Sequence, residues 1–257
     1  FIHSGFQVHY AILFGIVTSY LPFYLNGCEK KDGFLWPQFQ RLKFWRTLCD
    51  YHKATITIEK PLNHKQQYIF CCFPHGACTI NHILTMTDSC KMLSEVYTGE
   101  RRDLAASILF VFPIVREILL FLGCVDASAS TAKYNLKKGR SLYIYIGGEK
   151  EQLMTTPNES KIYLQNRKGF IKLALTHGAH LVPMYAFGEN EAYKISKLFM
   201  DFRIWLQENY KLGIPFAWGP SIFPLIPYPV QLGLEIGKPI IVEKKSEDKI
   251  TEKDIDN

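Results

Sequence analysis

Charged side chains are missing from the start of the chain. Residues 1–28 contain no Asp, Glu, Lys or Arg, and residues 8–25 are mostly apolar. As a helix that rises ~1.5 Å per residue, residues 8–25 reach about 27 Å, which is close to the thickness of a hydrocarbon core. We therefore expect residues 1–28 to be embedded in a membrane. His9, Gly15 and Pro22 weaken a simple spanning helix, so a re-entrant or paired segment is the alternative.

A signal peptide fits residues 1–28 less well, because the segment has neither a basic start nor a small-residue cleavage site. Basic residues follow the segment instead, and they indicate that its C-terminal side faces the cytosol. These residues are Lys30, Lys31, Arg41, Lys43 and Arg46.

The chain also lacks a paired cysteine framework. Its seven Cys are an odd number without even spacing, which excludes a disulfide scaffold and favours reduced thiols in a cytosol-facing protein. One cluster raises the question of a zinc site, because Cys71, Cys72, His75, Cys78 and His82 lie close together in the sequence. Adjacent Cys71 and Cys72 on a strand would point to opposite faces, and no second ligand pair follows at finger-like spacing. We therefore expect no metal site.

A dense basic patch is absent as well. The 257 residues carry a net charge of +6, and their Lys and Arg are interspersed with Asp and Glu. This excludes the usual electrostatic footprint of a nucleic-acid-binding protein. A mildly basic surface suits an anionic membrane or a phosphate-bearing substrate better.

Apolar runs that end at Gly or Pro alternate with helical patterns, and the sequence contains no internal repeat. This order predicts an α/β domain with a mixed or parallel sheet flanked by helices. Residues 34–51 fit either an interfacial helix or an amphipathic core helix. The expected strands are residues 68–72, 141–146 and 181–187; the expected helices are 34–51, 77–92, 161–177 and one after Pro113 within 104–125; residues 214–228 are expected to be irregular.

The tetrapeptide Phe73-Pro74-His75-Gly76 directly follows the first expected strand. Pro and Gly end the strand and place His75 on a loop at its carboxyl end, the edge of an α/β sheet where ligands bind. Histidine also has the side chain whose ordinary pKa suits proton transfer near neutral pH. On its own this motif predicts either a catalytic histidine or a turn histidine packed against the core.

Two further motifs support the catalytic interpretation. The sequence contains YIFCCFPHG, then SLYIYIGGEKEQL, then NRKGFIKLALTHGAHLVPMYAFGENE, in this order. Together with Pro113, Arg116 and Glu117, which lie between the first two blocks, they resemble the mono- and diacylglycerol acyltransferase family, of the diacylglycerol acyltransferase type 2 group. The resemblance covers roughly residues 8–240.

The resemblance implies a glycerolipid acyltransferase-like fold over residues 29–257 and an integral endoplasmic-reticulum enzyme. Such an enzyme moves an acyl group from acyl-coenzyme A to the free hydroxyl of a glyceride and needs no cofactor. His75 matches the family's catalytic histidine and Glu151 the acid of its Gly-Gly-x-x-Glu block. Residues that match the family's other motifs are Phe73, Pro74, Gly76, Arg116, Gly147, Gly148, Arg167, Lys168, Gly169, Phe170, Glu189 and Asn190.

Two positions depart from the family pattern. Phe73 stands where members usually carry His or Tyr, or Pro in plants, so a polar contribution from that position is missing. The wider acyltransferase class pairs its histidine with an Asp five positions later. Here that position is Ile80, which excludes a local His–Asp relay and requires a partner from elsewhere in the chain.

The chemistry of acyl transfer explains these residue types. The attacking alcohol must lose its proton, so one placed base is required, and His75 can supply it if an acid holds its other ring nitrogen. Glu151 is our candidate for that acid. Backbone N–H groups near Gly147-Gly148 or Gly76 could bind the oxyanion.

Two basic residues are expected to bind the phosphates of coenzyme A. Arg167 and Lys168 lie at the start of a helix, where such groups are bound, although a solvated basic face is the alternative. Arg116 beside Glu117 fits a structural ion pair as well as a substrate role. An acyl-enzyme route through Cys71, Cys72 or Cys78 is a rival mechanism, which needs a partly exposed thiol near His75.

We therefore expect a diacylglycerol acyltransferase in the endoplasmic-reticulum membrane or on lipid droplets, with its catalytic domain facing the cytosol. Its partners would be acyl-coenzyme A, diacylglycerol and membrane lipid, without nucleic acid, and self-association stays open. Monoacylglycerol or a long-chain wax alcohol are alternative acceptors, and a non-catalytic lipid-binding scaffold is the alternative from another class. The absence of an initial Met and the charged end suggest a fragment that lacks both ends of the family's usual length.

Overall fold

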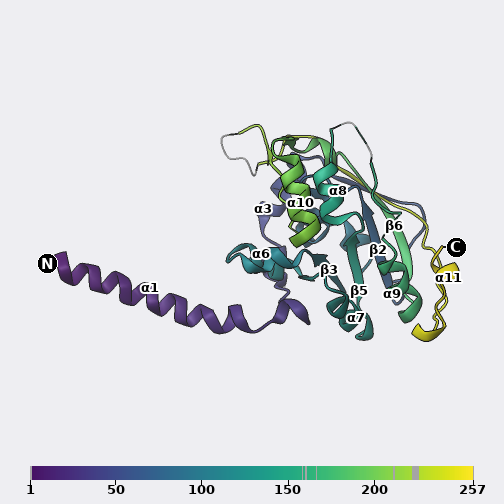
Figure 1. Ribbon diagram of the computed structural model, residues 1–257, viewed down its shortest axis with the longest axis horizontal. Coiled ribbons are helices and arrows are strands. Elements are labelled where there is room, and N and C mark those ends of the chain that lie inside the picture. The colour runs from purple at the N-terminus through teal and green to yellow at the C-terminus, as the bar shows by residue number, and fades with distance from the viewer. Residues whose placement is uncertain are drawn as a thin grey trace.

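A seven-stranded mixed sheet forms the centre of the computed structural model (Figure 1). The structure describes residues 2–157, 159, 161–165, 167–210, 212–221 and 226–256, with side chains from residue 9 onward. The strand order is β1-β9-β6-β2-β5-β3-β4, and a separate pair joins β7 to β8. The strands are β1 (Thr55–Ile58), β2 (Tyr68–Phe73), β3 (Arg101–Ala105), β4 (Cys124–Asp126), β5 (Ser141–Tyr145), β6 (His180–Phe187), β7 (Lys194–Ile195), β8 (Ala217–Trp218) and β9 (Gly233–Ile236).

Helices pack around this sheet, so the predicted α/β class is confirmed. The α-helices are α1 (Ile2–Leu25), α2 (Pro37–Gln40), α3 (Lys43–Tyr51), α4 (Ile80–Thr85), α5 (Leu93–Val96), α6 (Val115–Leu122), α7 (Ala129–Lys137), α8 (Gly148–Met154), α9 (Gly169–His177), α10 (Met200–Tyr210) and α11 (Glu252–Asp256). Short 3₁₀ helices are η1 (Cys28–Lys30), η2 (Asp88–Cys90), η3 (Ser107–Val111), η4 (Glu189–Glu191) and η5 (Glu247–Lys249).

The central strand β2 brings the predicted motifs together. It runs parallel to β5 on one side and to β6 on the other, with Cys72 opposite both Tyr145 and Met184. Parallel strands end at the same edge of a sheet, so the loops after β2, β5 and β6 meet there. Only the β6–β9 pair of this sheet is antiparallel within the part of the chain that the structure describes.

The three predicted strands are confirmed, whereas several predicted helices are shorter or broken. Residues 34–51 form α2 and α3, and residues 77–92 form α4 followed by a 3₁₀ turn. The helix expected over 161–177 begins only at Gly169. The apolar stretch 104–125 does contain a helix after Pro113, but its two ends belong to strands β3 and β4. Apolar composition alone could not separate these short strands from helix.

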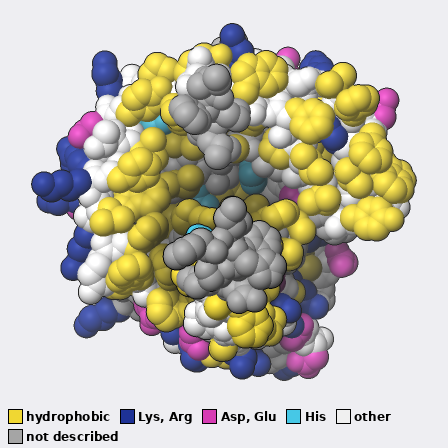
Figure 2. All heavy atoms as spheres, turned by 90° about the vertical axis from the view of Figure 1, so that its left-hand side faces the viewer, with side chains coloured by type: hydrophobic (Ala, Val, Ile, Leu, Met, Phe, Trp, Pro, Cys, Tyr) yellow, Lys and Arg dark blue, Asp and Glu magenta, His cyan; other side chains and the backbone are white. Residues whose placement is uncertain are grey.

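Helix α1 projects away from the sheet (Figure 1). Its 24 residues make it about 36 Å long at 1.5 Å per residue. The segment His9–Lys30 is long and apolar enough to cross a membrane, and none of it is buried in the protein. The predicted N-terminal apolar helix is therefore confirmed as a single helix. Figure 2 views the molecule from the side on which α1 projects, and hydrophobic side chains cover much of that face.

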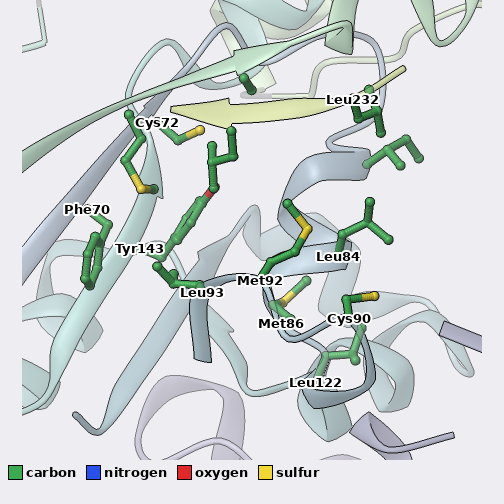
Figure 3. Close-up of a cluster of buried hydrophobic side chains, with 14 of the residues drawn as sticks. Phe70, Cys72, Leu84, Met86, Cys90, Met92, Leu93, Leu122, Tyr143 and Leu232 are labelled. Atoms are coloured by element: carbon green, nitrogen blue, oxygen red, sulfur yellow. The ribbon is translucent and has the colours of Figure 1, made fainter. Parts of the chain in front are cut away.

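The two faces of the sheet carry separate hydrophobic clusters. Alternate residues of β2 point to opposite faces, so Cys72 belongs to the larger cluster and Cys71 to the smaller one, as the strand pattern predicts. Figure 3 shows Phe70 and Tyr143 of the larger cluster, with Leu84 of α4 in the same cluster. Strand β2 is buried on both sides, which explains its uninterrupted apolar sequence.

Candidate active site

The loop after β2 holds His75 at the carboxyl edge of the sheet. The Phe73–Pro74 peptide bond is cis, and the φ of Gly76 is 65°, a left-handed conformation that favours glycine. The His75 ring lies edge-on to Tyr145 of β5, with ring centroids 5.2 Å apart. Phe73 packs in the same manner against Tyr185 of β6 at 5.8 Å. The neighbouring strand ends thus fix the sides of the histidine loop.

The ring of His75 is held as a neutral base. Its Nδ1 lies 3.0 Å from the carbonyl oxygen of Gly76, so Nδ1–H donates to that oxygen in the neutral ring. This tautomer leaves the lone pair of Nε2 free to accept a proton. Burial lowers the pKa of His75 to about 4, which keeps the ring unprotonated at neutral pH.

Glu151 contacts His75 in a different way from the one expected. Its Oε1 accepts a hydrogen bond from the backbone N–H of His75 at 2.5 Å, and its Oε2 accepts one from the backbone N–H of Tyr163 at 2.9 Å. The carboxylate therefore holds the histidine loop through the backbone. The ring nitrogen Nδ1, which we expected Glu151 to bind, is bound by the Gly76 carbonyl instead. Burial raises the pKa of Glu151, and the two N–H donors and Arg167 oppose that rise.

The two glycines after β5 allow this approach. A Cβ at Gly147 would lie 2.1 Å from Oε2 of Glu151, so no side chain fits there. Gly148 has a φ of 55° and begins α8, the helix that carries Glu151. Arg167 closes the turn, because its Nη2 donates to the carbonyl oxygen of Gly147 at 3.1 Å. The structure thus brings Gly147, Gly148 and Arg167 to the histidine loop.

Glu189 supports the loop from the end of β6. Its side chain is buried and accepts hydrogen bonds from the backbone N–H groups of Ile80 and Asn81, at 2.5 and 3.0 Å, at the start of α4. The side-chain amide of Asn81 also donates to it at 2.8 Å. Burial raises the pKa of Glu189 to about 8, because the loss of hydration outweighs these donors. A Cβ at Gly76 would lie 2.6 Å from Cγ of Glu189, so the two residues pack without space between them.

Three of the predicted site residues have other partners. Arg116 is buried and pairs with Glu29 at 2.9 Å and Glu117 at 3.0 Å, which favours the ion-pair interpretation over the substrate role. Lys168 is exposed and pairs with Asp256 at 2.6 Å and with Glu252 at 3.4 Å, both in α11. Asn190 donates to the carbonyl oxygen of Glu159 at 2.8 Å.

Comparison with known proteins identifies the family. A family model described as diacylglycerol acyltransferase matches residues 5–257. The chain belongs to this family. The resemblance that the sequence motifs predict is therefore confirmed.

Individual members of the diacylglycerol acyltransferase family share about one third of their aligned residues with this chain. Diacylglycerol O-acyltransferase 2 of Homo sapiens is 34% identical over 229 residues, which are 82% of this chain and 58% of that protein. The 2-acylglycerol O-acyltransferase 3 of Homo sapiens is 30% identical over 78% of this chain and 63% of its own. Diacylglycerol O-acyltransferase 1 of Saccharomyces cerevisiae is 33% identical over 81% of this chain and 62% of its own. The chain thus spans about three fifths of these relatives.

Among solved structures, a 1-acyl-sn-glycerophosphate acyltransferase from Thermotoga maritima aligns with a TM-score of 0.47 and 14% identity. The alignment covers 79% of this chain and 68% of that one. This likeness is too distant to assign a function.

A cavity lies beside α8 in this member of the acyltransferase family. Its volume is about 510 Å³, and Tyr163, whose N–H binds Glu151, is part of its wall. The lining combines apolar side chains with three lysines, so it offers room for an acyl chain and cations for an anionic group. The described residues that line it are Lys150, Leu153, Met154, Thr155, Thr156, Pro157, Lys161, Tyr163, Ile195, Lys197, Met200, Ile204, Gln207 and Glu208.

The cysteines near His75 are poorly suited to act as nucleophiles. Burial raises the pKa of Cys72 to about 12 and that of Cys78 to about 11, and it also raises the pKa of Cys71. A thiol with a raised pKa carries little thiolate at neutral pH. Among the residues that the structure describes, no group of three or more His, Cys, Asp and Glu is placed to hold a metal ion.

Sequence reasoning missed a buried histidine–aspartate pair behind His75. Nε2 of His82 lies 3.1 Å from Oδ2 of Asp103, and Arg101 binds the same carboxylate with two hydrogen bonds. Burial alone would raise the pKa of Asp103, but Arg101 and His82 together hold it below its ordinary value. His82 also stacks on Tyr143, with centroids 4.4 Å apart. The available signal is His82 itself, which the sequence presents only as a candidate zinc ligand.

Proposed function

We propose that this chain is the catalytic portion of an acyl-coenzyme A-dependent O-acyltransferase that esterifies diacylglycerol to triacylglycerol. Membership of the diacylglycerol acyltransferase family supports the reaction class and the glyceride acceptor. The observation that carries the proposal is the neutral His75, whose Nδ1 faces the Gly76 carbonyl and whose Nε2 is left as the base.

In this mechanism Nε2 of His75 accepts the proton of the glyceride hydroxyl as its oxygen attacks the thioester carbonyl. The carbon–oxygen ester bond forms and the carbon–sulfur bond breaks. The proton on His75 then passes to the leaving thiolate of coenzyme A. Each turnover therefore returns His75 to its neutral form and releases an ester and a free thiol.

The residues around His75 hold the loop and the developing charge. Glu151 keeps the loop in place by its bond to the His75 backbone N–H, so that N–H is not free to bind an oxyanion. Backbone N–H groups near Gly147-Gly148 and after Gly76 stay our candidates for the oxyanion. Arg167 lies at the same turn and can meet an anionic group of acyl-coenzyme A.

The cavity beside α8 is the proposed acyl-coenzyme A site. Its apolar wall suits the acyl chain, and Lys150, Lys161 and Lys197 suit phosphates once Lys150 and Lys161 exchange their ion pairs with Glu208 and Glu159. Arg167 lies 5.6 Å over the ring of Tyr163 and so links this cavity to the Gly147 turn. Lys168 can join the phosphate site only by exchanging its ion pairs with α11. We keep it as a weaker candidate for coenzyme A binding.

The diacylglycerol acceptor is dissolved in the bilayer, and α1 supports membrane association of the chain. We propose the endoplasmic-reticulum membrane as its location, with residues 29–257 facing the cytosol, because basic residues follow the apolar segment. Monoacylglycerol is the second candidate acceptor, because a 2-acylglycerol acyltransferase is among the relatives.

Replacement of His75 tests the proposal. His75→Ala should abolish triacylglycerol formation while the protein stays folded and membrane-bound, because the residue lies on a strand-end loop. The measurement is the lipid extract of cells that lack their own triglyceride synthesis and express either form of the chain. Activity of His75→Ala within a few-fold of wild type would show that the base is another residue. A wild-type chain that makes diacylglycerol or wax ester instead would reassign the acceptor.

A further inference from the structure

Helix α10 buries two long polar side chains and exposes its aromatic ones, together with Asp201, Glu208 and Asn209. Arg203 is 1% exposed and Gln207 5%, whereas Phe199, just before the helix, is 64% exposed and Phe202 58%. Arg203 is held by backbone carbonyls, with Nε bonded to Ile214 at 2.7 Å. A helix that faces water carries the reverse pattern, with its apolar side against the core. The exposed side of α10 therefore carries large aromatic side chains beside its polar ones.

We name the exposed apolar side chains of α10 and of the two residues before it the α10 patch. It consists of Leu198, Phe199, Phe202, Trp205 and Tyr210, and its members are between 47% and 67% exposed. Phe202 stacks on Trp205 at 5.8 Å, and Trp205 meets Tyr210 edge-on at 5.5 Å. Soluble proteins rarely expose connected apolar surface of this kind, and Trp, Tyr and Phe are the side chains that favour the headgroup region of a bilayer.

Helix α10, which carries most of the patch, lies on the side of the sheet toward α1 (Figure 1). The base of α1 is fastened to η3 and α6, because the Tyr24 hydroxyl donates to the Val111 carbonyl at 2.7 Å and Arg116 pairs with Glu29. Phe112 and Ile114 between η3 and α6 are 51% and 73% exposed. If α1 enters a bilayer, these neighbours of its base lie close to the same headgroups.

Figure 2 views this face directly. Hydrophobic side chains surround a hollow in which histidine surface is visible, and the hollow opens in the direction of α1. A lipid surface against this face would cover the hydrophobic side chains around the hollow. It would also contact the mouth of the hollow.

We propose that the α10 patch is a second lipid contact, which lies in the headgroup region of the same leaflet that α1 enters. The proposal rests on the membrane association proposed above and extends it to the surface of the catalytic domain. Two separated contacts fix the orientation of the domain, whereas α1 alone would leave it free to swivel. The hollow that Figure 2 shows on this face is then held against the bilayer that supplies the glyceride.

Tryptophan fluorescence tests the contact directly. The full chain is mixed with phosphatidylcholine vesicles whose acyl chains are brominated near the headgroup, and wild type is compared with Trp205→Phe. We expect wild-type emission to be quenched and Trp205→Phe, which keeps the patch apolar, to lose a large share of that quenching. Equal quenching of the two proteins while both float with the vesicles would overturn the α10 contact and leave membrane association intact. Failure of both proteins to float would overturn membrane association itself.

A charge substitution tests the consequence for catalysis. Phe202→Asp should lower the ratio of activity on vesicle diacylglycerol to activity on detergent-dispersed diacylglycerol by about tenfold. Ile241→Asp is the matched control, because Ile241 is 77% exposed and lies outside the α10 patch. An equal ratio in both variants would overturn the proposal. So would conversion of a dimer to a monomer by Phe202→Asp in detergent, because the patch would then contact a second copy of the chain.

Discussion

At the scale of single residues, the site is built around a histidine that burial keeps neutral. Two backbone groups, the Gly76 carbonyl and the His75 N–H, fix the ring and the loop separately. The ring therefore has a defined tautomer without an acid at Nδ1. This arrangement makes a specific prediction about the pH dependence of turnover.

The acid limb of kcat/KM should lie near pH 4 instead of near pH 6.5, because burial lowers the pKa of His75 to about 4. The unfolded chain binds this proton at about pH 6.5, so the contribution of His75 to stability is lost as the pH falls from about 6.5 toward 4. The measurement is kcat/KM between pH 3.5 and 8, with folding checked at each pH. A limb centred near pH 6.5 would mean that the base is solvated.

Replacement of Glu151 should slow the reaction strongly, with little change in the apparent affinity for acyl-coenzyme A. In Glu151→Gln one acceptor oxygen becomes an amide that opposes either the His75 or the Tyr163 N–H. The control is Glu149→Gln, the same change two residues earlier. The double variant with His75→Ala should be hardly worse than His75→Ala alone, since residues that act as one unit are not additive. Additive losses would separate the role of Glu151 from that of His75.

At the scale of elements, three strand ends and the starts of two helices meet. The loop after β2 packs on Glu189 after β6, and Glu189 in turn binds the backbone at the start of α4. The turn after β5 carries Glu151 on α8 toward the same loop. A substitution that alters the packing of these strand ends should therefore displace His75 even where it makes no contact with that residue.

Gly76→Ala should inactivate the protein and destabilise it by about 1–3 kcal/mol. The new Cβ would lie 2.6 Å from Cγ of Glu189, at a backbone φ of 65°. Gly139→Ala separates the two causes, because Gly139 has a φ of 80° but nothing within 4 Å of its Cβ position. Thermal unfolding and turnover of both variants are the measurements. Equal effects of the two substitutions would show that backbone strain, and not contact with Glu189, limits this position.

At the scale of the whole molecule, an apolar helix projects from the side of the sheet on which α10 lies (Figure 1). Arg116 connects that helix to the domain by its contacts with Glu29 and with the carbonyl oxygen of Phe23. We propose that this side, with α1 and α10, is the lipid side of the molecule. This proposal predicts that a substitution on the lipid side lowers turnover of the glyceride more than it lowers binding of acyl-coenzyme A.

Phe14→Arg should reduce turnover of membrane diacylglycerol far more than acyl-coenzyme A binding. Phe14 is 72% exposed on α1, and a charge near the centre of a membrane helix costs ~2.5–3.5 kcal/mol by insertion measurements. Phe14→Leu, which keeps the position apolar, is the control. Flotation with vesicles and a separate acyl-coenzyme A binding assay are the measurements. Unchanged glyceride turnover by Phe14→Arg would contradict a membrane-embedded α1.

The local features of the site could be predicted from the sequence. Short contiguous patterns predict a buried strand before Pro74 and another before Gly147. Because parallel strands end at the same edge of a sheet, His75 and Glu151 could be expected to meet. The partner atom could not be predicted, because whether a carboxylate reaches a ring nitrogen or a backbone N–H depends on small displacements of the loop. The same holds for His82, whose partner Asp103 lies on β3, a short charged strand that the sequence does not predict.

By itself, the sequence determined the α/β class, the apolar first helix, the family and the position of the histidine loop. These follow from turn residues, period and motifs, which depend on neighbours along the chain. Only the tertiary structure decided that Glu151 binds the backbone of His75, that Arg116 fastens α1, and that α10 turns its aromatic face outward. The physical reason is that such choices are made between segments far apart in the chain. Which of two possible contacts a side chain makes is decided only when the folded sheet brings those segments together.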